Sequence, residues 1–188
     1  MMMQRCFWCK ECNPVYVAYH DTEWGVPQFD DRYLFEMLVL ESFQAGLSWE
    51  CILNKREQFR QAFDGFAPEI IQNYSTETVE QLMQNPGIVR NRRKILAAIS
   101  NAAVFLDIIA EHGSFLAYLK TFWDGVIRME TGKTHSDLSD ALSKDLQRRG
   151  MKFVGTTILY SYLQAIGIVN SHEPDCFLHG MPSTPSSL

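Results

Sequence analysis

Two cysteines and two histidines near opposite ends of the chain have the residue types of a metal site. Cys6 and His20 lie near the N-terminal end, whereas His172 and Cys176 lie near the C-terminal end. Two thiolates and two imidazoles form the ligand set of a closed tetrahedral zinc site. Such a site would join the two terminal segments of the chain.

The other cysteines leave this assignment open. Cys9 and Cys12 are rival ligands, and ordinary buried thiols with surface histidines would explain the same residues without a metal. The total of five cysteines is odd, and residues 1–10 contain no apolar core of a secretion signal. We therefore expect a metal or thiol role in the cytoplasm rather than disulfides.

A basic segment at residues 82–95 has the pattern of two helices joined by a short glycine turn. Backbone N–H groups at the start of the second helix can bind a DNA phosphate, so the turn at Gly87 is a candidate DNA contact. Four basic side chains follow this glycine: Arg90, Arg92, Arg93 and Lys94. A plain helical hairpin with a solvated basic face is the alternative, and the basic run at residues 148–152 has the same two interpretations.

Glu41 is a carboxylate on an apolar helical stripe that also contains Leu34, Leu38 and Ala45. A buried carboxylate is costly unless it is paired, so it predicts either a basic partner or a cationic or donor-rich ligand. Aromatic faces attract cations and stack on an extruded base. The candidate aromatic residues are Trp8, Tyr16, Tyr19, Trp24 and Trp49. A plain aromatic core, with Glu41 paired to an arginine, is the alternative.

Helical periodicity dominates the chain, without a convincing strand or internal repeat, and predicts an all-α fold. Five residues are expected to cap or begin helices: Asp30 or Asp31, Ser48, Ser75 and Ser114. With the breakers they predict helices at residues 31–45, 48–63, a short one from Pro68, 75–82, a long one through Ile95 and Ile109 that ends near Gly113, and further helices at 114–123, 140–150 and 156–168. Residues 125–136 are expected to form a loop, and Ser139 or Asp140 to cap the helix that ends at Gly150.

Composition limits the function classes. The chain of 188 residues can form one domain or two small lobes that share a groove, and its net charge of −5 argues against a protein that coats nucleic acid non-specifically. Asp107 interrupts the longest apolar run, so we expect no membrane insertion. The Pro- and Ser-rich residues 182–188 are expected to form a disordered tail.

Five motifs carry a family resemblance: YHDTEWGVP at 19–27, LFEML at 34–38, QAGLSW at 44–49, PGIVR at 86–90 and KFVGT at 152–156. With them, nearly the whole chain resembles the 3-methyladenine DNA glycosylase I family. The resemblance implies a helix-hairpin-helix glycosylase fold, with a single domain at residues 1–180 whose two helical lobes flank a groove for DNA and base. It also implies one structural zinc ion, carried onto Cys6, His20, His172 and Cys176.

The family's functional residues map onto positions already noted. Glu41 would accept hydrogen bonds from the adenine edge, and the rings of Trp8, Tyr16, Tyr19, Trp24 and Trp49 would stack on the flipped base. Gly46 and Leu47 would lie at the DNA edge of the pocket. The hairpin residues Gly87, Val89, Arg90 and Arg92 would contact the DNA backbone.

The implied activity is that of a monofunctional glycosylase. It would hydrolyse the N-glycosidic bond of 3-methyladenine in double-stranded DNA, release the free base and leave an abasic site. We expect a cytoplasmic monomer. A zinc hydrolase or nucleobase deaminase would need a second cysteine near Cys176, which the sequence lacks. A non-catalytic, zinc-stapled helical module that binds DNA or a damaged nucleotide is the remaining alternative.

The chain departs from the family pattern at two places. The segment between Cys6 and His20 is one residue longer than usual and contains Cys9 and Cys12. Ser42 and Phe43 replace a smaller or more polar pair, which predicts an altered rim of the base pocket.

Overall fold

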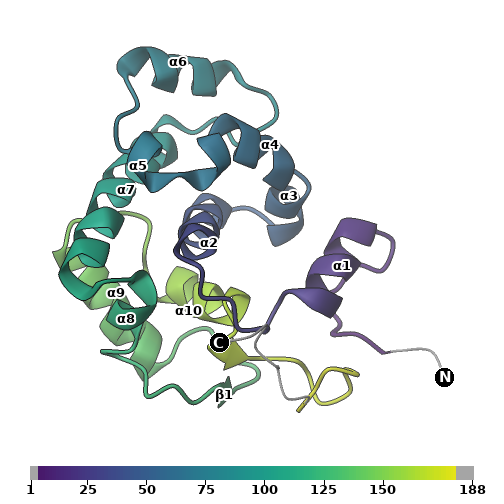
Figure 1. Cartoon of the computed structure of the whole chain (residues 1–188). Helices are drawn as coiled ribbons and strands as arrows, with labels where there is room; N and C mark the ends of the chain where they lie inside the picture. The colour runs from purple at the N-terminus through teal and green to yellow at the C-terminus, as the bar shows by residue number, and fades with distance from the viewer. Residues whose placement is uncertain (1–3, 181–188) are drawn as a thin grey trace.

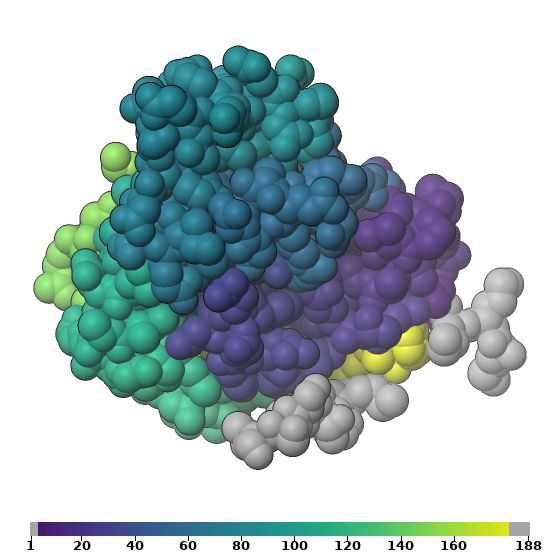
Figure 2. Space-filling model, turned by 45° about the horizontal axis from the view of Figure 1, so that its top comes forward, coloured from purple at the N-terminus to yellow at the C-terminus, as the bar shows by residue number. Residues whose placement is uncertain are grey.

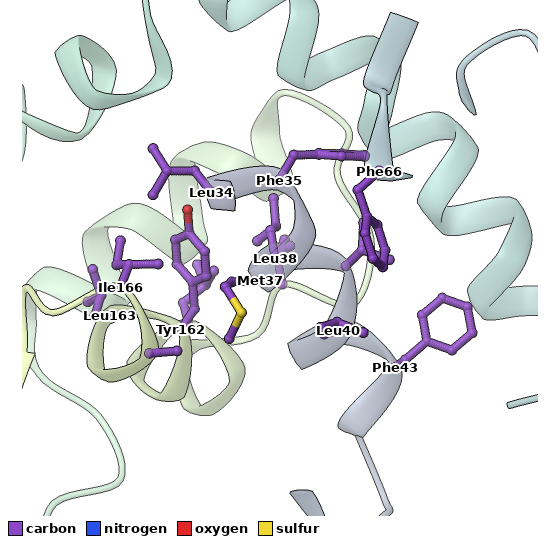
Figure 3. Close-up of a cluster of buried hydrophobic side chains, with 14 of the residues drawn as sticks. Leu34, Phe35, Met37, Leu38, Leu40, Phe43, Phe66, Tyr162, Leu163 and Ile166 are labelled. Atoms are coloured by element: carbon purple, nitrogen blue, oxygen red, sulfur yellow. The ribbon is translucent and has the colours of Figure 1, made fainter. Parts of the chain in front are cut away.

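The central helix α2 (Asp31–Gln44) lies among the other helices of the protein, as the computed structural model shows for residues 4–180 (Figure 1). Each of its residues 34–43 is buried, which explains why its sequence is apolar on every side except for a few polar residues. The Asp30 side chain accepts the N–H of Tyr33 at 3.1 Å and caps the helix as predicted. Helix α10 (Thr156–Ala165) packs against α2, with Tyr162 beside Met37 (Figure 3).

The other helices surround this centre. On the N-terminal side they are α1 (Pro14–Thr22), α3 (Trp49–Leu53), α4 (Arg56–Ala62), the 3-10 helix η1 (Asp64–Phe66), α5 (Pro68–Ile71) and α6 (Thr76–Gln84). On the C-terminal side they are α7 (Arg92–His112), α8 (Phe115–Leu119) and α9 (Asp137–Arg148). The mostly helical fold is confirmed, and one continuous hydrophobic core extends from Cys6 to Cys176. The predicted tail lies outside the described residues.

Several element boundaries differ from the prediction. The helix predicted at residues 48–63 is two helices, because the chain turns at Asn54 and Lys55. The helix from Ser114 ends at Leu119 rather than continuing to Trp123. Ser136 caps α9, and Ser139 is the third helical residue of a capping box instead of the cap. Helix α1 was missed, although Asn13 caps it and Pro14 begins it.

The prediction that the chain has no strand was wrong in a small region. Two short strands, β1 (Arg128–Met129) and β2 (Val169–Asn170), pair in parallel. β1 lies in the segment that was predicted to be a loop, and β2 follows α10. Gly167 precedes β2 with a φ of +77°, and an added Cβ would lie 2.3 Å from the backbone N of Pro27. A glycine is therefore required where the chain passes this close to residues 26–27.

Helix α7 is long and apolar enough to cross a bilayer by length and composition. In the fold it packs against α2, α5, α6 and α8, and eight of its side chains are buried. These contacts are those of a core helix in a folded domain. With α6 it forms the predicted hairpin, and α6 lies in the lobe at the top of the molecule in Figure 2.

Candidate functional site: a base pocket beside a Cys/His cluster

The structure brings Cys6, His20, His172 and Cys176 together. All four are buried, and their ligand atoms lie within 4.8 Å of one another. The Cys6 Sγ and Cys176 Sγ atoms lie 3.6 and 3.5 Å from His172 Nδ1, and Cys176 Sγ lies 3.5 Å from His20 Nε2. Tetrahedral zinc with its usual bond lengths places sulfur and nitrogen ligands about 3.6 Å apart. The four residues therefore fit a tetrahedral zinc ion.

Neighbouring groups orient these ligands. His20 Nδ1 lies 2.8 Å from Asp21 Oδ1, and Arg5 holds the same carboxylate at 2.7 Å. The Arg5 hydrogen bonds lower the pKa of Asp21. A carboxylate behind a histidine fixes its tautomer and strengthens it as a metal ligand. Neither Arg5 nor Asp21 was predicted to belong to this site, although Asp21 directly follows His20 in the chain.

Cys9 and Cys12, the rival candidate ligands, lie outside this cluster. Cys9 is buried and Cys12 is exposed, and neither contributes to the four-residue group in the described part of the chain. Burial raises the pKa of the Cys6 thiol to about 12 and lowers that of His172 to about 4. A neutral His172 has a lone pair available for a metal.

A cavity of about 320 Å³ lies beside the cluster. Glu41 and all five predicted aromatic residues line it: Trp8, Tyr16, Tyr19, Trp24 and Trp49. Ring centroids are 4.7 Å apart for Trp8 and Trp24, and 5.4 Å apart for Tyr19 and Trp49. The two tyrosines lie on α1, Glu41 lies on α2, and Trp49 begins α3, which Ser48 caps. The cavity thus has mostly aromatic walls and two carboxyl groups, those of Glu41 and Glu173, a composition that suits a cationic base.

Two buried carboxylates on α2 have opposite surroundings. Glu36 accepts hydrogen bonds from Arg56 at 2.6 Å and from Arg60 at 3.0 Å. Glu41 is 4% exposed and has no hydrogen bond or ion pair with any other residue in the described part of the chain. Burial raises its pKa to about 8. The alternative of an arginine partner therefore applies to Glu36 and not to Glu41.

The cavity and the Cys/His cluster share neighbours. His172 Nε2 lies 3.3 Å from the Trp24 carbonyl oxygen, and the Trp8 ring lies 5.2 Å from the His20 ring. In Figure 1 the segment after α10 passes beside α1, which carries two of the aromatic residues. Closing the terminal segments on each other therefore positions one wall of the cavity.

Seven lining residues were not predicted: Phe7, Gln44, Gly132, Ser161, Gln164, Ser171 and Glu173. Gln164 Nε2 donates to Ser171 Oγ at 2.7 Å. Gln44 lies three residues after Glu41 on α2, a helical spacing that could have identified it. The other six have no local spacing signal, because they reach the cavity from the N-terminal segment, from the segment after β1, from α10 and from the segment after α10.

The hairpin turn keeps part of its backbone free. The Gly87 N–H donates to Asn85 Oδ1 at 2.8 Å, so that N–H is already used. The N–H groups of Val89 and Arg90 have no partner among residues 4–180. Arg90 is exposed, whereas Arg92 is paired with Glu80 at 2.6 Å. The turn therefore presents two backbone donors and one unpaired guanidinium.

Lys94 differs from the other basic residues of the hairpin. It was expected to add surface charge, but it is buried and its Nζ donates to the carbonyl oxygens of Phe43 at 2.8 Å and Ala45 at 2.6 Å. It thus caps the end of α2, where the helix dipole is negative. The exposed residues Gly46 and Leu47 follow directly, so Lys94 connects the hairpin to this turn.

The predicted effect of Phe43 on the pocket rim was wrong. Phe43 is fully buried and belongs to the hydrophobic cluster on α2 (Figure 3). Its ring packs on that of Phe59, with ring centroids 4.9 Å apart. Ser42 donates to the Phe153 carbonyl oxygen at 3.1 Å. Both residues belong to the interior packing of α2, and neither lines the cavity.

Comparisons with known proteins agree with this geometry. A family described as methyladenine glycosylase matches residues 8–179. DNA-3-methyladenine glycosylase 1 of Escherichia coli K12 is 45% identical over 93% of this chain and 96% of its own. A crystal structure of 3-methyladenine DNA glycosylase I is 48% identical, covers 94% of this chain and 100% of its own, and has a TM-score of 0.89.

A second solved structure holds a ligand. It is a tyrosine-to-phenylalanine variant of 3-methyladenine DNA glycosylase I in complex with 3-methyladenine, 36% identical with a TM-score of 0.88. It covers 97% of this chain and 98% of its own. The family match spans the cavity, the hairpin and most of the Cys/His cluster, and from it we conclude that this chain belongs to the methyladenine glycosylase family.

Proposed function

We infer that this chain is a monofunctional DNA glycosylase that hydrolyses the N-glycosidic bond of 3-methyladenine in alkylated DNA and leaves an abasic site. The observation that carries this inference is Glu41, an unpaired buried carboxyl group in a cavity lined by aromatic rings. Family membership and a relative in complex with 3-methyladenine support the same substrate.

The pocket selects the lesion by its charge. 3-Methyladenine in DNA is a cation, whereas adenine is neutral. Entry of the cation favours the ionised form of Glu41, which then accepts hydrogen bonds from the base, while the aromatic faces stack on it. Neutral adenine gains neither the ion pair nor the cation–π attraction, so the damaged base is held more tightly.

The lesion supplies most of the chemical activation. As the bond from the sugar carbon to the base breaks, its electron pair neutralises the positive base, and the sugar becomes an oxocarbenium ion. Water adds to this carbon and releases a proton to solvent. No lysine or aspartate is found among the described residues that line the cavity, which agrees with hydrolysis rather than attack by an amine of the protein.

DNA binding is assigned to the hairpin and to the turn after α2. Val89 and Arg90 hold a phosphate through backbone N–H groups and a guanidinium, with Gly87 shaping the turn and Arg92 adding charge once it leaves Glu80. Gly46 and Leu47 enter the space that the extruded nucleotide leaves. This arrangement corresponds to a helix-hairpin-helix glycosylase, with residues 1–180 as one domain of two lobes.

Zinc serves a structural role in this proposal. Cys6, His20, His172 and Cys176 would hold one ion and leave no open position for water, so the ion would supply cross-linking rather than catalysis. The protein acts as a monomer in the cytoplasm on double-stranded DNA.

The activity is tested with methylated DNA and the purified chain, with chromatographic identification of the released bases. We expect free 3-methyladenine and no 7-methylguanine. If folded protein binds the DNA but releases no base, the chain is instead a non-catalytic binding module.

A further inference from the structure

Phe7 is the most exposed large apolar side chain of the described residues, at 87% exposure, and it lines the base cavity. It lies between Cys6 of the metal cluster and Trp8 of the pocket. Exposed apolar side chains are ordinary on a surface, but one at the opening of a ligand cavity is available to cover part of the ligand.

The backbone of Phe7 is held in place. Its N–H donates to Glu173 Oε2 at 2.7 Å, and Glu173, which also lines the cavity, is connected to Cys6 because its own N–H donates to Cys6 Sγ at 3.4 Å. On the other side, the Trp8 ring contacts Tyr16 and Trp24. The side chain of Phe7 therefore extends from a fixed point at the opening.

The depth of the pocket indicates what Phe7 contacts. Tyr16, Tyr19 and Trp24 are only 4–8% exposed and form the inner walls, where a planar base fits. With the base inside, the deoxyribose occupies the opening. We propose that Phe7 packs against the deoxyribose of the extruded nucleotide and so adds affinity for flipped DNA but not for the free base. This inference rests on the proposed function.

The test distinguishes a contact of Phe7 with the deoxyribose from a contact with the base. Affinities are measured for a duplex with a tetrahydrofuran abasic analogue, for the unmodified duplex and for free 3-methyladenine. For Phe7→Ala we expect roughly tenfold weaker binding of the abasic-analogue duplex, in line with the loss of one buried aromatic side chain. Binding of the other two ligands and the Tm should stay the same. Phe7→Trp should restore binding of the abasic-analogue duplex.

Two controls make the result specific. Ile70→Ala removes a different exposed apolar side chain, which lies on α5 and does not line the cavity, and it should change none of the three affinities. Glu41→Gln should weaken free-base binding and leave the abasic-analogue duplex unaffected. Unchanged binding by Phe7→Ala, or an equal loss for the free base or the unmodified duplex, would overturn the inference. Release of 3-methyladenine by the wild type is measured separately. A failure of the proposed glycosylase function is therefore distinguished from a failure of the proposed contact between Phe7 and the deoxyribose.

Discussion

At the scale of single residues, Glu36 and Glu41 show the difference between a buried carboxyl group that stabilises the fold and one that is available to a ligand. Both lie on α2, but only Glu36 has guanidinium partners. A buried carboxyl group without a partner costs stability when it ionises, and an enzyme retains it where a ligand supplies the missing charge.

This cost predicts a pH dependence. The pKa of Glu41 is about 8 in the folded protein and near 4.5 in the unfolded chain, so the folded state retains a proton that the unfolded chain has lost. The contribution of Glu41 to the free energy of unfolding is full below pH 4.5 and falls as pH rises towards 8, by at most about 1.4 kcal/mol per unit. Glu41→Gln should therefore be stabilised relative to the wild type, increasingly so as pH rises.

Denaturant unfolding across this pH range measures the difference. Glu69→Gln is the matched control, because Glu69 is exposed and should follow the wild-type curve. An equal pH slope for wild type and Glu41→Gln would show that Glu41 titrates normally.

Residue types predicted much of the candidate site. The five aromatic residues and Glu41 meet at one cavity, and the four residues of the Cys/His cluster meet beside it. The residues that support them were missed, because their roles depend on distant partners. Lys94 has the sequence context of a surface charge, and only the approach of α7 to the end of α2 makes it a buried cap.

At the scale of elements, the hairpin α6–α7 makes a separate prediction. Arg90 is exposed and unpaired in the described part of the chain. Arg90→Ala should weaken binding of all duplex sequences and reduce the salt dependence of affinity, with a decrease of about 0.9 in the slope of log K against log salt.

Fluorescence titration of labelled duplex at several salt concentrations provides this slope. Lys120→Ala, an exposed cation at the end of α8, should leave it unchanged. An unaltered slope in Arg90→Ala would show that the Arg90 guanidinium makes no phosphate contact.

Local signals predicted the elements unevenly. Asp30, Ser48, Ser75 and Ser114 all act as predicted helix caps, because a cap depends on only three or four neighbouring residues. The two-residue strands depend instead on the meeting of residues 128–129 with 169–170, some forty residues apart. Such a contact has no local sequence signal.

At the scale of the whole molecule, the Cys/His cluster joins segments separated by about 150 residues. By analogy with a disulfide, loss of such a cross-link lowers the free energy of unfolding by about 3 kcal/mol. In a chain of this size that loss lowers Tm by roughly 6–12 °C. Cys176→Ala should therefore lose zinc and stability while its choice of released base stays the same.

Metal analysis and thermal unfolding measure both effects, and Cys12→Ala, exposed and outside the cluster, is the control. A Cys176→Ala protein that is zinc-free, as stable as the wild type and inactive would contradict a structural role for the metal.

Recognition of the damaged base by Glu41 is tested by single-turnover release of 3-methyladenine from methylated duplex DNA by the wild type, Glu41→Gln and Glu69→Gln. We expect release by the wild type and by Glu69→Gln, and a rate at least about tenfold lower for Glu41→Gln, because that variant loses one charge-assisted contact. Equal rates for all three proteins would contradict the role of Glu41 as the group that recognises the damaged base.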